Sequence, residues 1–280
     1  MLKDEKIKKT QNAVVIAILS VIAFVQFFPL VWVVDFSLNK SGDLFVSGIL
    51  KWPSEPQFQN YVIAWTRGKI PQFFFNSTVV CLATVLLTLY LSLTLSYAFM
   101  RMKWKFNGFF FALIMLGMMI PVHTTLLPNF MVFNKIGIMD SYTALILPYA
   151  AFSIPMGVFI MTGFLNTLPK ALEESAVMDG CGTYRTIFSI ILPVTKPALV
   201  TVAILTFLSC WNEFIMAATY LSSERYKTLP FSVIKFTSEF GANYAYQFAV
   251  MTLCSLPALI VYIFLNEQIT KGIMVGALKG

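Results

Sequence analysis

Long apolar runs constrain this chain more than any other feature. Several uninterrupted stretches reach about 20 residues, the length that an α-helix needs to cross the hydrocarbon core of a bilayer. The runs do not alternate between apolar and polar residues, as the strands of a membrane barrel do. Of the 280 residues, 58% are hydrophobic and only 12% are charged, whereas soluble domains carry about 25% charged residues. The sequence therefore predicts an all-α, polytopic membrane protein.

The apolar runs predict six membrane spans in a single domain that covers residues 1–280. The first run continues to about Val34, which is too long for the apolar region of a secretory signal. The fifth run is the least regular, because it contains Asn212 and Glu213. The predicted spans are residues 13–34, 76–99, 107–127, 142–165, 197–220 and 247–266.

Basic residues predict how the spans are oriented. The net charge of +7 is carried by small basic clusters beside apolar runs, a pattern typical of cytoplasmic loops and not of nucleic-acid binding. The tight turn Arg101–Lys105 holds three of these residues, and short loops carry most of the orientation signal. Six spans place both termini on the same side as this turn. We expect both termini in the cytoplasm and residues 35–75 outside, as a small ordered cap.

A polar segment, residues 166–196, interrupts the apolar pattern on the predicted cytoplasmic side, between spans 4 and 5. Glu174 lies near the favourable N-terminal end of a first short helix. Gly180 can adopt the left-handed geometry that ends this helix. Thr183 can cap a second helix that closes at Pro193. From these residues alone, an amphipathic loop lying on the membrane surface is an equally good interpretation.

The spacing within this segment resembles the "EAA" signature of ABC-importer permeases. That signature reads Glu-Ala-Ala, three residues, Gly, nine residues, Ile, any residue, Leu-Pro. Ser175 stands where the signature has its first Ala, and serine is small enough to preserve close helix packing. The matching residues are Glu174-Ser175-Ala176, Gly180 and Ile190-Ile191-Leu192-Pro193.

The resemblance implies that residues 166–196 form a coupling loop, whose helix sits in a groove on a separate ATP-hydrolysing subunit. Glu174 would pair with the ATPase surface, Ala176 would be the small packing residue, and Gly180 would form the turn between the two helices. In the family subtype that this chain resembles, the C-terminal tail also reaches toward the ATPases, and its tip here would be Lys279 and Gly280. The implied ATPase-coupling residues are Glu174, Ser175, Ala176, Met178, Asp179, Gly180, Tyr184 and Pro193.

Further motifs along the chain are similar to the carbohydrate-uptake class of these permeases, and in detail to the six-span maltose/maltodextrin-type subunit. This resemblance implies a bacterial-type cell-membrane protein that imports a sugar, with an oligosaccharide as the expected substrate. It implies three kinds of partner: a second, different permease subunit, two ATP-binding subunits and an extracytoplasmic sugar-binding protein. The motifs are Phe75-Asn76-Ser77, the turn Arg101 to Gly108, Ile120-Pro121, Gly137 to Tyr142, Leu147-Pro148, Trp211 to Phe214, and Lys271 to Gly280.

The sequence lacks the motifs of an ATP-binding or catalytic protein. It contains no GxxxxGK[ST] phosphate loop, and no Ser/His/Asp or metal-ligand cluster. We therefore expect no enzymatic activity, no metal site and no cofactor in this chain, with ATP and magnesium bound by the partner ATPase.

Polar residues within the predicted spans leave alternatives open. Asn212 and Glu213 could lie on the substrate path, with Trp211 stacking on a sugar face, or they could bond to backbone or to the partner permease. His123, the one histidine, could relay protons or serve as hydrogen-bonded structure near a helix kink. The rival function is an ion-coupled secondary transporter or a channel. Such proteins usually depend on intramembrane ionisable groups, and here Glu213 is the clear example.

Overall fold

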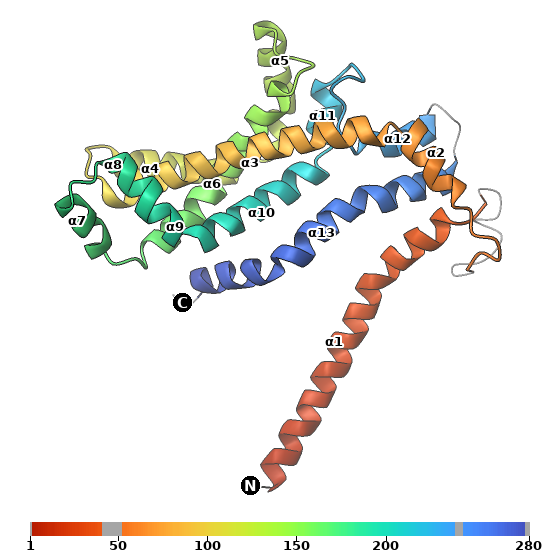
Figure 1. Cartoon of the computed structure of the whole chain (residues 1–280), viewed down its shortest axis with the longest axis horizontal. Helices are drawn as coiled ribbons and strands as arrows, with labels where there is room; N and C mark the ends of the chain where they lie inside the picture. Colours follow the sequence, from red (N-terminus) through yellow and green to blue (C-terminus); the bar gives the residue numbers. More distant parts are fainter. Residues whose placement is uncertain (1, 41–51, 239–242, 278–280) are drawn as a thin grey trace. The chain divides into compact units, whose positions relative to one another are not determined.

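The computed structural model describes residues 2–40, 52–238 and 243–277, and the regular structure within them is helical, as predicted (Figure 1). The backbone groups of a helix bond to one another, so they need no partner from the lipid, which offers none. The α-helices are α1 (Leu2–Ser37), α2 (Gln59–Arg67), α3 (Ile70–Arg101), α4 (Asn107–Leu116), α5 (Leu126–Ile136), α6 (Thr143–Leu165), α7 (Ala171–Met178), α8 (Thr183–Arg185), α9 (Leu192–Val194), α10 (Lys196–Asn212), α11 (Ile215–Tyr220), α12 (Phe231–Ser238) and α13 (Tyr244–Ala277). Shorter elements are the 3₁₀ helices η1 (Gly117–Met119) and η2 (Val122–Thr125) and the π-helix η3 (Thr186–Ile191).

In the part of the chain that the structure describes, four helices are long and apolar enough to cross a membrane. They are α1 from Asn12, α3, α6 and α13 as far as Phe264. Two bent helix pairs would raise the number to six if each counts as one span. Helices long and apolar enough to span a membrane are thus confirmed, whereas the number six and the cytoplasmic termini stay predictions.

The first bent pair falls on the third predicted span. Residues 107–127 are not one continuous helix, because the chain turns by 98° between Asn107–Met119 and Val122–Ile136. Ile120 and Pro121 are extended at this bend, with ψ of 117° and 124°. Proline has no N–H to donate and disfavours helical geometry in the residue before it. Apolar composition alone does not register this change of direction.

The fifth predicted span, residues 197–220, is also interrupted. Helix α10 ends at Asn212, Glu213 is extended with ψ of 132°, and α11 begins only at Ile215. The break falls on the polar residues that made this run the least regular.

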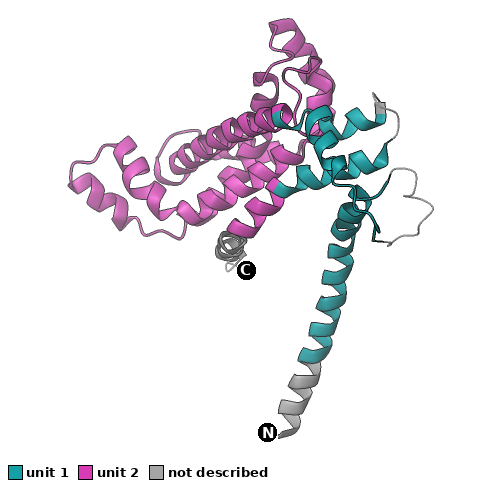
Figure 2. Ribbon diagram, turned by 45° about the vertical axis from the view of Figure 1, so that its right-hand side comes forward, with its two compact units in different colours: residues 1–71, 232–256 teal, residues 72–231, 257–280 magenta. Residues whose placement is uncertain are grey.

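The chain divides into two compact units (Figure 2). The first comprises residues 1–71 and 232–256, and the second comprises residues 72–231 and 257–280. The single domain over residues 1–280 remains a prediction.

In the first unit, α2 is tied to the end of α1. The Asn60 side chain is buried and donates from Nδ2 to the Ser37 carbonyl at 2.8 Å. Trp32 of α1 makes an edge contact with Phe248 of α13, with ring centroids 5.4 Å apart. The predicted cap therefore contains ordered helix, although residues 41–51 lie outside the described part of the chain.

The second unit is built around α3, α6 and α10, which run beside one another (Figure 1). A Cβ at Gly157 of α6 would lie 2.1 Å from the Ser92 hydroxyl of α3, so the side chain of any other residue would push the two helices apart. Ser96 donates to the Val158 carbonyl at 3.3 Å across the same contact. Four fully buried hydroxyls repeat every four residues along this face of α3: Thr84, Thr88, Ser92 and Ser96.

Candidate functional site

The predicted coupling loop forms the two short helices expected from the sequence. Helix α7 carries Glu173 and Glu174 in its first turn. Gly180 ends it with φ of +78°, which confirms the predicted left-handed turn. The Gly180 N–H donates to the Val177 carbonyl at 3.0 Å, and the Cys181 N–H donates to the Ala176 carbonyl at 2.9 Å. These two bonds make a Schellman motif, in which backbone groups alone close the helix.

Most of the predicted contact residues are exposed at the tip of this loop. Met178 is 87% exposed and Tyr184 is 74% exposed. Ala176 is the buried residue of α7, at 3%. Ser175, the residue that departs from the signature, is exposed on α7, and its hydroxyl donates to the Ala171 carbonyl of the same helix at 2.8 Å. Also exposed are Glu174, Ser175, Asp179, Gly180 and Pro193.

The second helix differs from the prediction at both ends. The N-cap residue of this helix is Gly182 and not Thr183. No side chain makes a capping hydrogen bond at this end. Pro193 does not end the helix, which continues through Val194 to a kink before α10. A proline cannot donate to the carbonyl four residues earlier, and the π-helical turn η3 lies directly before it.

The same helix is anchored to the long helices by apolar contacts. Ile187 is 5% exposed and Ile191 is 0% exposed. They share a core cluster with Leu93 of α3, Met161 of α6 and Val202 of α10. The exposed tip of the coupling loop is thus attached to a rigid base.

Arg101, at the end of α3, is a contact residue that sequence reasoning missed. Its Nε donates to Glu173 Oε1 at 2.7 Å, and its Nη2 donates to the Leu165 and Leu168 carbonyls at 2.9 and 3.0 Å. The signal was present, because Arg101 follows directly after an apolar run, but Arg101 was interpreted as an orientation charge and as the start of a family-like turn, and not as a partner of Glu173.

Glu213 lies at the break between α10 and α11 with its carboxylate fully engaged. Oε1 accepts from the Met216 N–H at 2.7 Å, and Oε2 accepts from the Ala217 N–H at 3.3 Å and from the Tyr149 hydroxyl. Such bonds satisfy the free N–H groups of the first turn of α11. Glu213 is therefore hydrogen-bonded to backbone, which agrees with the second of the two interpretations that the sequence left open.

The other two residues predicted for the substrate path differ from each other. Trp211 is 4% exposed and packs between Phe74 and Phe207, at centroid distances of 5.5 and 5.2 Å. Asn212 is exposed and donates to the Leu208 carbonyl at 3.0 Å. The Trp211 ring is therefore part of the helix packing, whereas Asn212 remains accessible.

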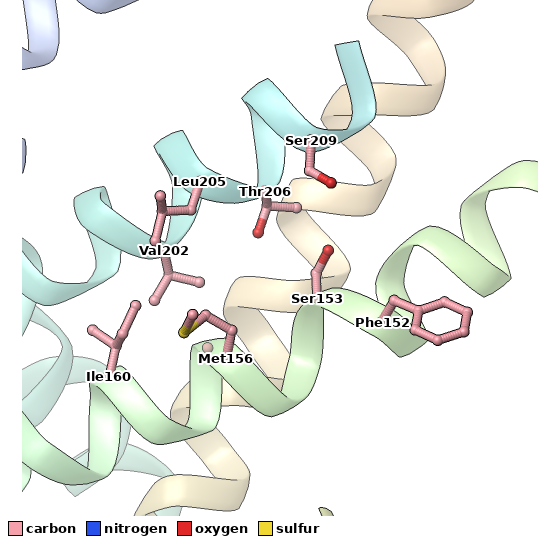
Figure 3. Close-up of a pocket in the computed structure, with 9 residues that line it drawn as sticks. Phe152, Ser153, Met156, Ile160, Val202, Leu205, Thr206 and Ser209 are labelled. Atoms are coloured by element: carbon pink, nitrogen blue, oxygen red, sulfur yellow. The ribbon is translucent and has the colours of Figure 1, made fainter. Parts of the chain in front are cut away.

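Two adjoining pockets, with volumes of about 170 and 190 Å³, form a groove that begins between α6 and α10 and continues to the bend at residues 117–122 and to Met216 of α11. Both are lined by Phe152, Ser153 and Ser209, and the second also by Tyr149 and Glu213. Figure 3 shows the hydroxyls of Ser153, Thr206 and Ser209 turned into the space between the two helices. We call this surface the hydroxyl groove.

Two predicted positions gain no assignment. His123 is exposed in η2, just after the bend at Pro121, so its role stays open. Lys279 and Gly280 lie outside the described residues.

Comparison with known proteins decides the family. Residues 85–275 match the family described as binding-protein-dependent transport system inner membrane component. This chain belongs to that family.

Relatives that match nearly the whole length of this permease support the same family. It is 37% identical over 252 residues to a protein of Caldicellulosiruptor sp. (strain Rt8B.4) described as an ABC transporter permease protein, ORF2, with 90% of this chain and 91% of the relative covered. It is 30% identical over 285 residues to the galactooligosaccharides transport system permease protein GanQ of Bacillus subtilis, with both chains covered completely. The chain is thus a transporter subunit and not an enzyme.

The fold of the permease also matches a solved structure. A chain from the crystal structure of a bacterial ABC transporter involved in the import of the acidic polysaccharide alginate superposes with a TM-score of 0.81 at 19% identity. The match covers 92% of this chain and 96% of the other. At this identity the likeness establishes the ABC permease fold alone.

Proposed function

We propose that this permease forms half of the translocation path of an ATP-driven, binding-protein-dependent importer of sugars, with oligosaccharides as the expected class. The names of its relatives support this substrate class. GanQ is named for galactooligosaccharides, and a relative from Agrobacterium fabrum, 30% identical over 253 residues, is named for sulfoquinovosyl glycerol. In this proposal residues 1–280 form one permease domain with six spans and cytoplasmic termini, and residues 166–196 form its coupling loop.

The observation that carries the proposal is the exposed tip of the coupling loop. Large apolar side chains exposed together mark a docking surface, and Met178 and Tyr184 are among the most exposed in the second unit. Glu174 adds an exposed negative charge nearby. We infer that a separate ATPase subunit, which binds ATP and magnesium, holds this tip. The proposed contact residues are Glu174, Ser175, Ala176, Met178, Asp179, Gly180, Tyr184 and Pro193, with Lys279 and Gly280 as a second contact.

Transport then follows from a shift between two conformations. ATP binding closes the two ATPase subunits, and the coupling loop moves with them because Ile187 and Ile191 anchor it to the membrane helices. The permease and its different partner permease rock from inward-facing to outward-facing, and the binding protein delivers sugar to the cavity between them. ATP supplies the differential affinity for the two states that such a shift requires.

The hydroxyl groove is the proposed contribution of this chain to the substrate path. Thr206 and Ser209 have no hydrogen-bond partner among the described residues. Thr84, Thr88 and Ser92 of α3 also have none, but Thr206 and Ser209 line a pocket, where water or a sugar can reach them. Unpaired hydroxyls are costly in lipid, so this face suits a water-filled path in which sugar hydroxyls exchange hydrogen bonds. Glu213 lines the second pocket of this groove, Asn212 is the exposed residue before it, and Trp211 packs against Phe74 and Phe207.

The rival ion-coupled transporter finds less support. Its candidate ionisable group, Glu213, has its carboxylate occupied by two backbone N–H groups and the Tyr149 hydroxyl.

The decisive experiment reconstitutes the permease with its partner permease, ATPases and binding protein in proteoliposomes. We expect uptake of radiolabelled oligosaccharide to require ATP and to stop when the ATPase carries a substitution that abolishes hydrolysis. Uptake that continues with the inactive ATPase would overturn the proposal in favour of ion-coupled transport.

A matched pair of variants tests the coupling loop in the same system. A Cβ at Gly180 meets no atom within 4 Å, so Gly180→Val adds only backbone strain of about 1–2 kcal/mol in the left-handed region. We expect this variant to insert normally but to lose most of its uptake. Gly180→Asn is the control, because asparagine adopts this geometry readily, and should retain uptake.

A further inference from the structure

We propose that Arg101 is a positioning residue for energy coupling, which fixes the rotation of α7 about its own axis and joins it to the ends of α3 and α6. The inference rests on the proposed function, since it concerns how ATPase motion reaches the membrane helices. Its basis is the set of three hydrogen bonds that one guanidinium makes, one to α7 and two to the carbonyls at the end of α6.

The first bond is a buried ion pair. Arg101 Nε lies 2.7 Å from Glu173 Oε1, and the two side chains are only 7% and 12% exposed. Exposed ion pairs contribute little, but breaking a buried pair leaves an uncompensated charge and is strongly unfavourable. The pairing therefore specifies one arrangement of α7 against α3.

The other two bonds join the same side chain to the end of α6. The last four carbonyls of a helix have no partner within it, and Leu165 is the last residue of α6. Arg101 Nη2 donates to the Leu165 and Leu168 carbonyls. A planar guanidinium with several fixed donors can hold all three acceptors together, and a lysine ammonium cannot reproduce that geometry.

The ion pair also sets the direction of the neighbouring acid. Successive helical residues differ by roughly 100° around the axis. With Glu173 held toward Arg101, Glu174 is directed outward, where it is exposed. Ala176 is the buried residue of this helix, and its methyl side chain makes no directional bond that would fix the rotation. Arg101 thus determines where Glu174 and Met178 meet a partner.

The test compares variants in the complete complex in proteoliposomes, measuring ATP hydrolysis, sugar uptake and thermal stability for each. Arg101→Gln removes the charge and three of the five N–H donors. We expect the complex to assemble and hydrolyse ATP within about twofold of the wild type, while the sugar imported per ATP falls about tenfold, within the range of known coupling energies. Arg101→Lys should recover part of this ratio. Glu173→Gln should lower it about threefold, because the amide oxygen still accepts a hydrogen bond from the charged guanidinium but carries no negative charge.

Lys103→Gln is the matched control, since Lys103 is an exposed basic residue of the same turn. It should leave the ratio unchanged. An unchanged ratio in Arg101→Gln, or uptake that falls only in proportion to the amount of folded complex, would overturn the inference. If Arg101→Gln does not assemble, unchanged ratios in both Arg101→Lys and Glu173→Gln would overturn it equally. Absence of ATP-dependent uptake in the wild type would instead contradict the proposed function.

Discussion

The coupling loop and the break at Glu213 are both polar interruptions of an apolar chain, and they use their acids in opposite ways. Glu174 is exposed, and the helix that carries it is closed by backbone bonds from Gly180 and Cys181. Glu213 spends its carboxylate on the first N–H groups of α11 and on Tyr149. An acid is therefore available for a partner where the backbone closes its own helix, and it is occupied where a helix end needs it.

The largest effect should come from Glu174. Truncation of a residue central to an interface costs about 2 kcal/mol or more, roughly thirtyfold in affinity. We expect Glu174→Ala to weaken ATPase binding by this amount and to reduce sugar uptake accordingly, with normal insertion of the chain. Binding can be followed by co-purification and by titration of the ATPase.

Ser175→Ala is the matched control on the adjacent exposed position. Ser175 belongs to the proposed contact, but its hydroxyl bonds to the Ala171 carbonyl of its own helix, so loss of the hydroxyl should change binding far less than Glu174→Ala does. Equal effects of the two variants would show that the Glu174 carboxylate contributes no more to ATPase binding than the residue beside it.

Substitution of Glu213 should mainly change stability. Glu213→Ala leaves the N–H groups of Met216 and Ala217 without their acceptor, at a cost of about 1–2 kcal/mol. Glu213→Gln retains an acceptor oxygen and should cost less. Thermal unfolding of the purified complex measures the loss, and uptake per folded complex should stay within about twofold of the wild type.

The comparison would fail if Glu213→Gln abolished uptake while the complex remained fully folded. That result would identify Glu213 as a residue of the substrate path despite its occupied carboxylate.

Asp140 extends the comparison to an acid between helices, in the loop joining α5 and α6. Its Oδ1 accepts from the Ser222 and Ser223 N–H groups, each at 2.9 Å. Burial acts to raise the pKa of this carboxyl, but these bonds outweigh it and hold the pKa below the ordinary value of 3.8. The charged form thus stabilises the folded state above that pH, and this contribution disappears as the pH falls through the lowered pKa.

Asp140 has a left-handed backbone, with φ of +55°, which asparagine also adopts. We expect Asp140→Asn to lower the unfolding temperature by about 2–4 °C at most at neutral pH. The difference from the wild type should be constant down to about pH 5 and shrink below the ordinary pKa of the carboxyl. A difference that grows on acidification would contradict the assigned sign.

Sequence reasoning reached the parts of this molecule that depend on local spacing. The helices, the paired helices of the coupling loop and the turn at Gly180 follow from apolar length, helix-ending residues and motif spacing. It expected a helix kink near His123 but treated residues 107–127 as one span and missed the 98° turn at Pro121, because hydropathy measures how apolar a run is and not which way the chain points. It also missed the Arg101–Glu173 pair, because the two residues are 72 positions apart and no local pattern joins them. The role of Glu213 was left open for the same reason, since Tyr149 belongs to another helix.

The Schellman turn of α7 makes the shape of the coupling loop depend on residue count more than on residue identity. Its closing bonds join main-chain atoms of Ala176, Val177, Gly180 and Cys181, so most side chains along it can vary without altering its path. Adding or deleting one residue here would rotate everything beyond it by a quarter-turn or more. Serine in place of alanine at position 175 leaves that residue count unchanged. The spacing that defines the motif is therefore preserved.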